Sequence, residues 1–348
     1  MAGIKEFFSN GIGIDLGTAN TLVYAKDTNE ITSEPSVVAV YNNSKKVVAV
    51  GEKAKKMLGK TPGNITAIRP MKAGVIADFE ITEIMLRYFI QKAAKKWNFI
   101  APHVVVAVPS GITEVERRAV QESAIHAGAS SVFLKDEPLM AAIGVGLPIE
   151  EPTASMIVDI GGGTTDMGVL SLSGIAISRS IKTAGNAFDE AIIKYVRRKY
   201  NLIIGKRMAE EAKIAIGCVY PRKEMVKHRV KGRNAMTGLP QWADISCDEM
   251  LEALIEPAMQ IIYTVQEMLE KTPPELMGDV YSDGIILTGG SSQLFGFDKL
   301  ISKKTKMPVR IAEEPDMCVA RGAGLAIKYI EDIESKAYGV LNPLSAAY

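Results

Sequence analysis

The chain has 348 residues, 47% of them hydrophobic, and its 41 basic and 40 acidic side chains leave a formal net charge of +1. Such a length is enough for two domains with substantial cores, and the composition is that of a globular rather than a disordered protein. The nearly even charge balance gives no indication of nucleic acid as a partner. No apolar run reaches the roughly 18 residues needed to span a bilayer, and we expect no signal peptide at the amino terminus.

Cysteine and histidine are scarce and carry no metal-ligand pattern. The three cysteines are widely spaced, without a CxxC pair, so we expect buried thiols in a reducing cytoplasm. Only three histidines are present, which argues against a histidine-rich metal site.

The first half of the chain alternates strand and helix signals. Residues 12–50 predict several short strands, including a hairpin whose turn is Asn42-Asn43-Ser44. A capping box formed by Thr113 and Glu116 predicts the start of a helix that reaches about residue 127. The other expected elements are a helix over 79–96, a buried strand over 104–108, a short strand over 132–134 and a helix over 141–146.

The second half restarts with a strand pattern after Pro148–Thr153, which we interpret as a hinge. Helices are predicted near 187–200, 207–217, 247–271 and 317–331, and a buried strand over 284–288. We expect Pro257 to kink or end the third of these helices, and the basic stretch 221–233 to form loops and short strands. The alternation predicts an α/β protein with mixed sheets in two related halves.

Two short segments of the chain follow the same sequence pattern. Gly13-Ile14-Asp15-Leu16-Gly17-Thr18-Ala19-Asn20-Thr21 and Val158-Asp159-Ile160-Gly161-Gly162-Gly163-Thr164-Thr165-Asp166 each lie between apolar runs, which predicts two β-hairpins with glycine turns. Their separation is the size of a domain. Taken singly, each pattern is equally explained by an ordinary tight turn. Two at this spacing favour two halves that face a shared phosphate-binding cleft.

The residue types in these hairpins suit a phosphate with a hydrated metal ion. Glycine lets the backbone approach phosphate oxygens closely, and threonine hydroxyls add hydrogen-bond donors. Asp15 and Asp159 are candidates to hold Mg²⁺ through water, because Mg²⁺ retains much of its hydration shell.

Three further sites have competing interpretations. Glu137, between a strand and Pro138, is a candidate to orient a water molecule, although the sequence alone favours a surface acid. Glu210 and Lys213 lie one helical turn apart, a spacing that by itself favours a surface ion pair over a binding role. Gly289, Gly290 and Ser291 follow a buried strand and form a turn whose exposed backbone suits a flat purine base.

Two apolar segments are candidates for contact with a membrane. Phe7 and Phe8 lie on one face of a short amino-terminal segment. Trp97, Phe99 and Ile100 follow a group of lysines, a combination that suits the interface of an anionic bilayer. Ordinary core packing explains the second segment equally well, and both interpretations stay open.

The chain resembles the bacterial actin MreB family, within the actin-like ATPase superfamily. The superfamily motifs are the two aspartate-glycine hairpins and Leu287-Thr288-Gly289-Gly290, in this order. The finer match covers essentially the whole chain. It is carried by Glu34-Pro35-Ser36-Val37-Val38-Ala39, Pro70-Met71-Lys72-Ala73-Gly74-Val75-Ile76-Ala77-Asp78-Phe79, Val115-Glu116-Arg117-Arg118-Ala119, Ala184-Gly185-Asn186 and Val319-Ala320-Arg321-Gly322-Ala323-Gly324.

This resemblance implies an actin-like fold of two related domains around a nucleotide cleft, each with a large A and a small B subdomain. Domain I would span residues 1–147, with IA at 1–32 and 76–147 and IB at 33–75, and a helix over 317–348 would return to IA. Domain II would span 148–316, with IIA at 148–182 and 250–316 and IIB at 183–249.

The resemblance also implies roles for single residues. Thr18, Ala19 and Asn20 would contact phosphate from one side and Gly161, Gly162, Gly163 and Thr164 from the other. Glu137 would position the attacking water, with Thr164 near it and the γ-phosphate. Glu210 and Lys213 would contact the adenosine, and Gly289, Gly290 and Ser291 would close the base pocket. Asp166 stands where the family usually has Glu, a difference expected to affect hydrolysis more than binding.

The implied function is a cytoskeletal ATPase that uses ATP/ADP and Mg²⁺. Family members polymerise into antiparallel double protofilaments on the inner face of the cell membrane, so the expected partners are further copies of the chain, the membrane surface and membrane-bound morphogenesis proteins. The location would be cytoplasmic and peripheral to the membrane. The alternatives are a sugar-type kinase on the same fold, for which we find no sugar-binding segment, and a chaperone-type ATPase, which would need a peptide-binding domain.

Overall fold

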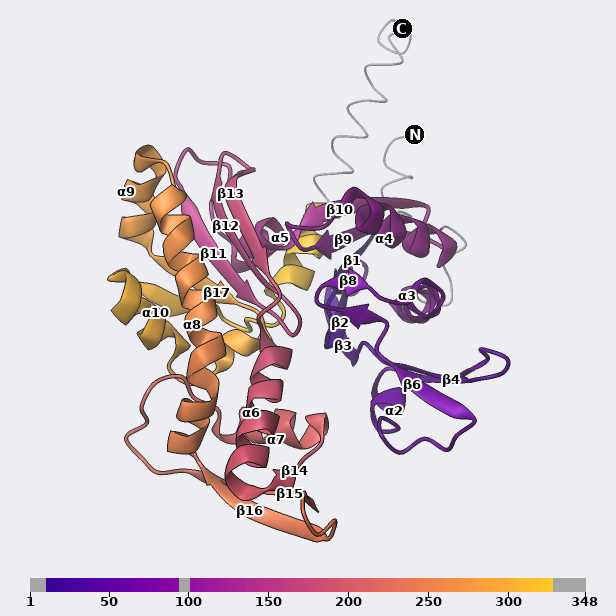
Figure 1. The fold of residues 1–348 in the computed structure, drawn as a ribbon. Coiled ribbons are helices and arrows are strands. Elements are labelled where there is room, and N and C mark those ends of the chain that lie inside the picture. The colour runs from indigo at the N-terminus through magenta and orange to yellow at the C-terminus, as the bar shows by residue number, and fades with distance from the viewer. Residues whose placement is uncertain (1–10, 94–100, 328–348) are drawn as a thin grey trace, which may run out of the picture. The chain divides into compact units, whose positions relative to one another are not determined.

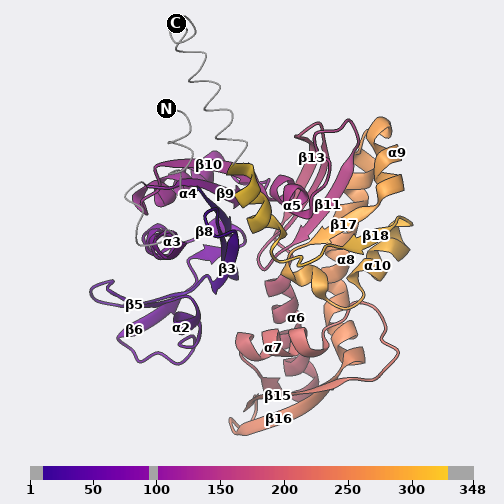
Figure 2. The ribbon, with the colours of Figure 1, turned by 180° about the vertical axis from the view of Figure 1, so that it is seen from behind.

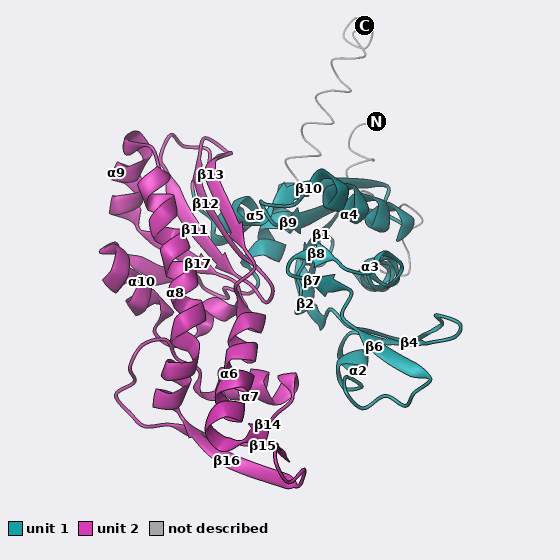
Figure 3. Cartoon of the chain, in the orientation of Figure 1, with its two compact units in different colours: residues 1–147, 317–348 teal, residues 148–316 magenta. Residues whose placement is uncertain are grey.

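The computed structural model describes residues 11–93 and 101–327. The chain forms two compact units, unit 1 with residues 1–147 and 317–348 and unit 2 with residues 148–316 (Figure 3). Each unit contains a five-stranded mixed sheet with helices packed against it (Figure 1), so the predicted α/β class is confirmed. No helix in these described ranges is long and apolar enough to cross a membrane.

The large sheet of unit 1 has the strand order β10-β9-β1-β2-β3. Strands β1, β2 and β3 form an antiparallel meander, and β9 and β10 run parallel to β1. Their bounds are β1 Gly11–Leu16, β2 Asn20–Ala25, β3 Glu30–Pro35, β9 His103–Val108 and β10 Ser131–Asp136. The continuous apolar run that predicted a buried strand is β9, whose Val104–Val108 segment is at most 2% exposed.

Three helices support this sheet. Helix α4 (Glu114–His126) begins at the predicted capping box, in which Thr113 and Glu116 each bond the other's backbone N–H. Helix α3 (Phe79–Ala93) packs against α4 and β2. Helix α5 (Glu137–Val145) begins four residues earlier than predicted and ends at Gly146, whose φ of 79° suits glycine.

Smaller elements complete unit 1. The strands β4 (Val38–Tyr41), β5 (Val47–Val50) and β6 (Ile65–Ile68) form a separate sheet, and its β4–β5 hairpin confirms the one predicted around residues 42–44. Helix α2 (Glu52–Lys55) packs on it. The short strands β7 (Met71–Lys72) and β8 (Val75–Ile76) pair with each other.

The large sheet of unit 2 repeats the topology of unit 1. Its order is β13-β12-β11-β17-β18, with three antiparallel neighbours followed by two parallel ones. The bounds are β11 Ser155–Ile160, β12 Thr165–Ser171, β13 Gly174–Ile181, β17 Ile285–Thr288 and β18 Val309–Ile311. Hairpin β11–β12 therefore occupies the same topological place as β1–β2, as the paired motifs predicted.

The helices of unit 2 surround its sheet and extend away from it (Figure 2). Helix α6 (Gly185–Tyr200) packs on both α7 (Lys206–Ile216) and α8 (Cys247–Lys271). The remaining elements are α9 (Pro274–Asp283), the 3₁₀ turn η1 (Gly290–Gln293), α10 (Phe297–Thr305) and the sheet of β14 (Leu202–Ile203), β15 (Lys227–Asn234) and β16 (Pro240–Ser246). Residues 318–327, the described part of the last predicted helix, are helical and belong to unit 1.

Two expectations for unit 2 held only in part. Most of the basic stretch expected as loops and short strands lies in the eight-residue strand β15, in which charged side chains alternate with others and Arg229 bonds Asp244 of β16 at 2.8 and 2.9 Å. Helix α8 continues through Pro257. Leu254, Ala258 and Ile261, on either side of Pro257, are fully buried, and this apolar packing offsets the backbone hydrogen bond that proline cannot make.

A polar network fastens α6 to the start of α8. Ser246 and Glu249 form a capping box on α8, and the Glu249 carboxylate also accepts from Lys199 at 2.8 Å and Tyr200 at 2.6 Å. Burial raises the pKa of Glu249, but the hydrogen bonds from Lys199, Tyr200 and Ser246 outweigh it and bring the pKa to about 2. The ionised carboxylate is thus more stable in the folded than in the unfolded chain.

Glu249→Gln is therefore expected to lower the free energy of unfolding at pH 7 by about 1–2 kcal/mol, since it removes charge-assisted bonds to two helices. Because the folded pKa lies below the ordinary 4.5, the advantage of Glu249 is complete above pH 4.5 and is lost as the pH falls toward 2. Urea unfolding of both proteins at pH 7 and pH 3 measures this. An equal difference at both pH values would contradict the role of the charge.

Candidate functional site

The β1–β2 turn of unit 1 is held in place by its surroundings. A Cβ atom on Gly17 would lie 2.4 Å from the Asn20 carbonyl oxygen, so glycine permits the tight approach. The Ser36 hydroxyl donates to the Gly17 carbonyl at 2.6 Å, and the buried Thr18 Oγ1 accepts from the Gly74 N–H at 2.9 Å. The turn thus has a fixed backbone, with Ala19 partly exposed and Asn20 exposed at its end.

Asp15 and Glu137 lie at the same edge of the unit 1 sheet. Asp15 is one residue from the end of β1, and Glu137 directly follows β10, which runs parallel to it with β9 between them. The carboxyl ends of parallel strands are where open α/β sheets bind ligands. Glu137 is only 7% exposed, so the surface acid that the sequence favoured is wrong. Its burial follows from its place as the first residue of α5, against the strand end.

The β11–β12 turn of unit 2 is bound from two further segments. The turn is closed by the Gly161 N–H, which donates to the Thr164 carbonyl at 3.0 Å. The first two N–H groups of α6 donate to the turn, Gly185 to the Gly161 carbonyl at 3.1 Å and Asn186 to the Gly162 carbonyl at 2.8 Å. The Ser291 hydroxyl also donates to the Gly161 carbonyl, at 2.7 Å. Gly161–Thr164, α6 and Ser291 are therefore brought together.

Asp159 carries a strongly perturbed carboxyl group beside this turn. It is 5% exposed at the end of β11 and accepts a hydrogen bond from Thr288 Oγ1 at 2.6 Å. Asp166 of β12 is fully buried and pairs directly with Asp159 across the hairpin. Burial raises the pKa of Asp159 to about 7, the Thr288 hydrogen bond opposes the rise and the charge of Asp166 adds to it.

Sequence reasoning did not assign roles to Thr288 or to the Asp159–Asp166 pair. A signal was available for both. Thr288 directly precedes Gly289 in the motif Leu287-Thr288-Gly289-Gly290. Residues at equal distances from a tight hairpin turn pair across the two strands, so the position of the turn indicates that Asp159 pairs with Asp166. What the sequence could not give is the burial of both carboxyl groups.

These residues fit a hydrated divalent cation in chemical type. A buried carboxyl group whose pKa is raised beside a second carboxylate gains most from a nearby positive charge. Within residues 11–93 and 101–327, no group of three or more His, Cys, Asp or Glu side chains could hold a metal ion directly. A cation such as Mg²⁺ would therefore keep most of its water ligands here.

The predicted nucleoside residues divide between α7 and the turn after β17. Lys213 is largely buried on α7, where its ammonium group bonds Asp189 Oδ1 at 2.8 Å and the Gly185 carbonyl at 3.0 Å. Glu210 is partly exposed one turn earlier. Gly289 has a φ of 80°, and a Cβ there would meet Ile160 backbone at 2.4 Å, so the turn packs directly on the end of β11.

The model for MreB/Mbl protein matches residues 9–335. The chain belongs to the MreB/Mbl family. Among curated relatives, it is 51% identical to the cell shape-determining protein MreB of Escherichia coli, over 94% of this chain and 97% of the relative. It is 48% identical to the cell shape-determining protein Mbl of Bacillus cereus, over 95% and 99%.

Solved structures match the fold of this chain. The crystal structure of MreB5 of Spiroplasma citri bound to AMPPNP superimposes with a TM-score of 0.90 at 38% identity, covering 94% of this chain and 99% of that one. The MamK double helical filament matches at a TM-score of 0.79 and 22% identity, over 92% and 99%, which supports the fold alone. The predicted actin-like fold is confirmed.

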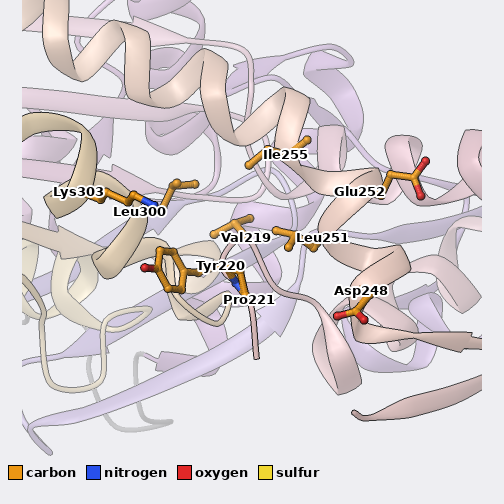
Figure 4. A pocket seen from close by; sticks show the side chains of 9 residues that line it. All are labelled: Val219, Tyr220, Pro221, Asp248, Leu251, Glu252, Ile255, Leu300 and Lys303. Atoms are coloured by element: carbon orange, nitrogen blue, oxygen red, sulfur yellow. The ribbon is translucent and has the colours of Figure 1, made fainter. Parts of the chain in front are cut away.

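Phe7, Phe8, Trp97, Phe99 and Ile100 lie outside the described residues. A separate cavity of about 350 Å³ lies in unit 2 beside α8 and α10 (Figure 4). Its walls are largely apolar, and the lining contains none of the predicted site residues: Val219, Tyr220, Pro221, Asp248, Leu251, Glu252, Ile255, Leu300 and Lys303.

The close approach of α6 to the β11–β12 turn predicts a specific cost for Gly185→Ala in this MreB/Mbl chain. The new Cβ would lie 2.7 Å from Ser291 Oγ and 3.3 Å from the Gly161 carbonyl oxygen, so the Ser291–Gly161 hydrogen bond would be displaced. We expect a loss of about 1–3 kcal/mol in the free energy of unfolding.

Gly278→Ala is the matched control, because a Cβ at this position in α9 would meet no atom of the described chain within 4 Å. It should be neutral or stabilising by up to about 1 kcal/mol. Urea unfolding of the two variants measures the contrast. Equal effects would show that the approach of Gly185 to the turn tolerates a methyl group.

Proposed function

We propose that this chain is a cytoskeletal ATPase that polymerises in its ATP-bound state and loosens its filaments after hydrolysis. The observation that carries the proposal is the duplicated strand–turn–strand device within a chain of the MreB/Mbl family. Each copy offers a glycine turn with adjacent hydroxyl groups, and each has an aspartate at the end of its first strand. Two Spiroplasma MreB5 structures are bound to AMPPNP and ADP, which supports an adenine nucleotide as the ligand.

The nucleotide would be held by backbone and side-chain groups of both turns. Thr18, Ala19 and Asn20 and the Gly161–Thr164 turn would bind the phosphates. Glu210 and Lys213 would contact the nucleoside, and Gly289, Gly290 and Ser291 would meet the base. The fixed backbone of each turn supports this assignment, since pre-ordered N–H groups bind an anion without a further cost in ordering.

A hydrated Mg²⁺ would neutralise charge on the phosphates near Asp15 and Asp159. Its positive charge would lower the pKa of Asp159 and so favour the ionised form of the Asp159–Asp166 pair. Asp166 is fully buried and pairs with Asp159, which supports a role for the two carboxyl groups together in setting the electrostatics of the turn.

Glu137 is proposed to orient the attacking water, with Thr164 near the γ-phosphate. A carboxylate at the start of a helix that directly follows a parallel strand has little freedom to move, which suits a positioning role. Domains I and II with their A and B subdomains, at the boundaries predicted above, remain part of this proposal.

Polymerisation and membrane binding complete the proposal. The matched relatives are named cell shape-determining proteins, a role that fits filaments beneath the membrane. We propose that the filaments are straight, antiparallel double protofilaments that also contact membrane-bound morphogenesis proteins. They would bind the inner membrane through Phe7, Phe8, Trp97, Phe99 and Ile100. A sugar-type kinase, the alternative function, is not supported, since the matched relatives are named for cell shape.

Sedimentation of the purified protein tests the proposed function. With ATP and Mg²⁺, we expect a pelleted fraction that rises above a critical concentration, because polymer contacts form only when subunits exceed it. The control contains ADP, for which the critical concentration should be higher. A chain that stays in the supernatant with ATP at high concentration, with and without anionic vesicles, would falsify the filament proposal.

Glu137→Gln is expected to slow phosphate release from ATP by about 10²-fold or more, the usual contribution of a group that orients and deprotonates water. Its affinity for ADP should stay within about twofold, because the substitution preserves shape and the residue is not assigned to binding. Phosphate release under single-turnover conditions measures the rate. Glu151→Gln, at an exposed acid, is the control. A Glu137→Gln rate close to that of wild type would remove Glu137 from the mechanism.

A further inference from the structure

A buried ion pair lies directly behind the β11–β12 turn. The Lys213 ammonium group of α7 and the Asp189 carboxylate of α6 are 2.8 Å apart, and their side chains are only 13% and 11% exposed. Removing both charged groups from water costs free energy unless well-placed hydrogen bonds and the ion pair itself compensate. Ion pairs of this kind therefore fix geometry more reliably than they add stability.

The pair joins α7 to the turn through one chain of hydrogen bonds. Lys213 donates a second bond to the Gly185 carbonyl at 3.0 Å, on the first residue of α6. The N–H of the same residue donates to the Gly161 carbonyl at 3.1 Å. Three residues thus connect α7 to the glycine turn, and Asp189 supplies the charge that holds the lysine in this position.

The ammonium group has three donors, and these two bonds use two of them. Asp189 is the fifth residue of α6, beyond its first turn, so its place is fixed by the ion pair with Lys213 rather than by the helix end.

We infer that Asp189 is a positioning residue for the nucleotide: it holds Lys213 so that one donor faces the nucleoside while another ties α7 to the phosphate turn. This inference rests on the proposed function. It predicts that the nucleoside half of the ligand depends on Asp189 more than the phosphate half does, because the turn retains its own bonds from Gly185, Asn186 and Ser291.

Asp189→Asn tests the inference, since asparagine keeps the shape and removes the charge. Isothermal titration calorimetry with ADP and with pyrophosphate separates the two halves of the ligand. We expect ADP affinity to fall about tenfold, the effect of losing one well-placed charge-assisted hydrogen bond, with pyrophosphate affinity changed less than about twofold.

Glu249→Gln is the matched control. It breaks another ion pair of α6, between Lys199 and Glu249 at 2.8 Å, at the opposite end of this helix from the turn. It should lower the melting temperature and leave both affinities unchanged. If Asp189→Asn weakens ADP and pyrophosphate equally, or neither, the positioning role is overturned. If wild-type protein binds no ADP, the proposed function fails as well.

Discussion

The carbonyl group of Gly161 is the point on which the architecture of unit 2 depends. It accepts from the N–H of Gly185 and from the hydroxyl of Ser291, two segments that are far apart in sequence. Both segments come close because neither residue carries a bulky side chain, and a single methyl group on Gly185 would meet Ser291 Oγ at 2.7 Å. Phosphate binding asks for a backbone that is already ordered, and this shared carbonyl supplies that order without using any side chain of the turn.

The turn of unit 1 is held by a similar arrangement. The Ser36 hydroxyl donates to the Gly17 carbonyl, and Thr18 accepts from Gly74. In both units the carbonyl of the first turn glycine is thus bound by a serine from a distant segment. Recurrence of one solution on sheets of identical strand order indicates that the constraint belongs to the turn itself rather than to either unit.

Much of this was readable from the sequence, for reasons that differ between elements. The hairpins, β9 and the capping box of α4 were predicted because each depends on local rules: glycine at tight turns, apolar runs in buried strands and side chains that bond neighbouring backbone. The burial of Glu137 was not, and the sequence did not decide whether α8 ends at Pro257, because both depend on packing against distant residues. The site residues were found mainly by resemblance, whereas the contacts of Lys213 with Asp189 and Gly185 required the structure.

The two equivalent aspartates, Asp15 and Asp159, pair with different residues in the two sheets. Asp15 faces Leu22 on one side and Ala107 on the other, whereas Asp159, at the equivalent place, faces Asp166 and Thr288. One aspartate therefore has apolar neighbours and keeps partial contact with solvent, and the other is buried between a carboxyl group and a hydroxyl group. Identical topology thus places two aspartates in different surroundings, and burial together with the charge of Asp166 raises the pKa of Asp159 to about 7. A buried carboxylate beside a second carboxyl group gains more from a nearby cation than a partly exposed carboxylate with apolar neighbours does. We therefore expect a bound cation to stabilise Asp159 of unit 2 more than Asp15 of unit 1.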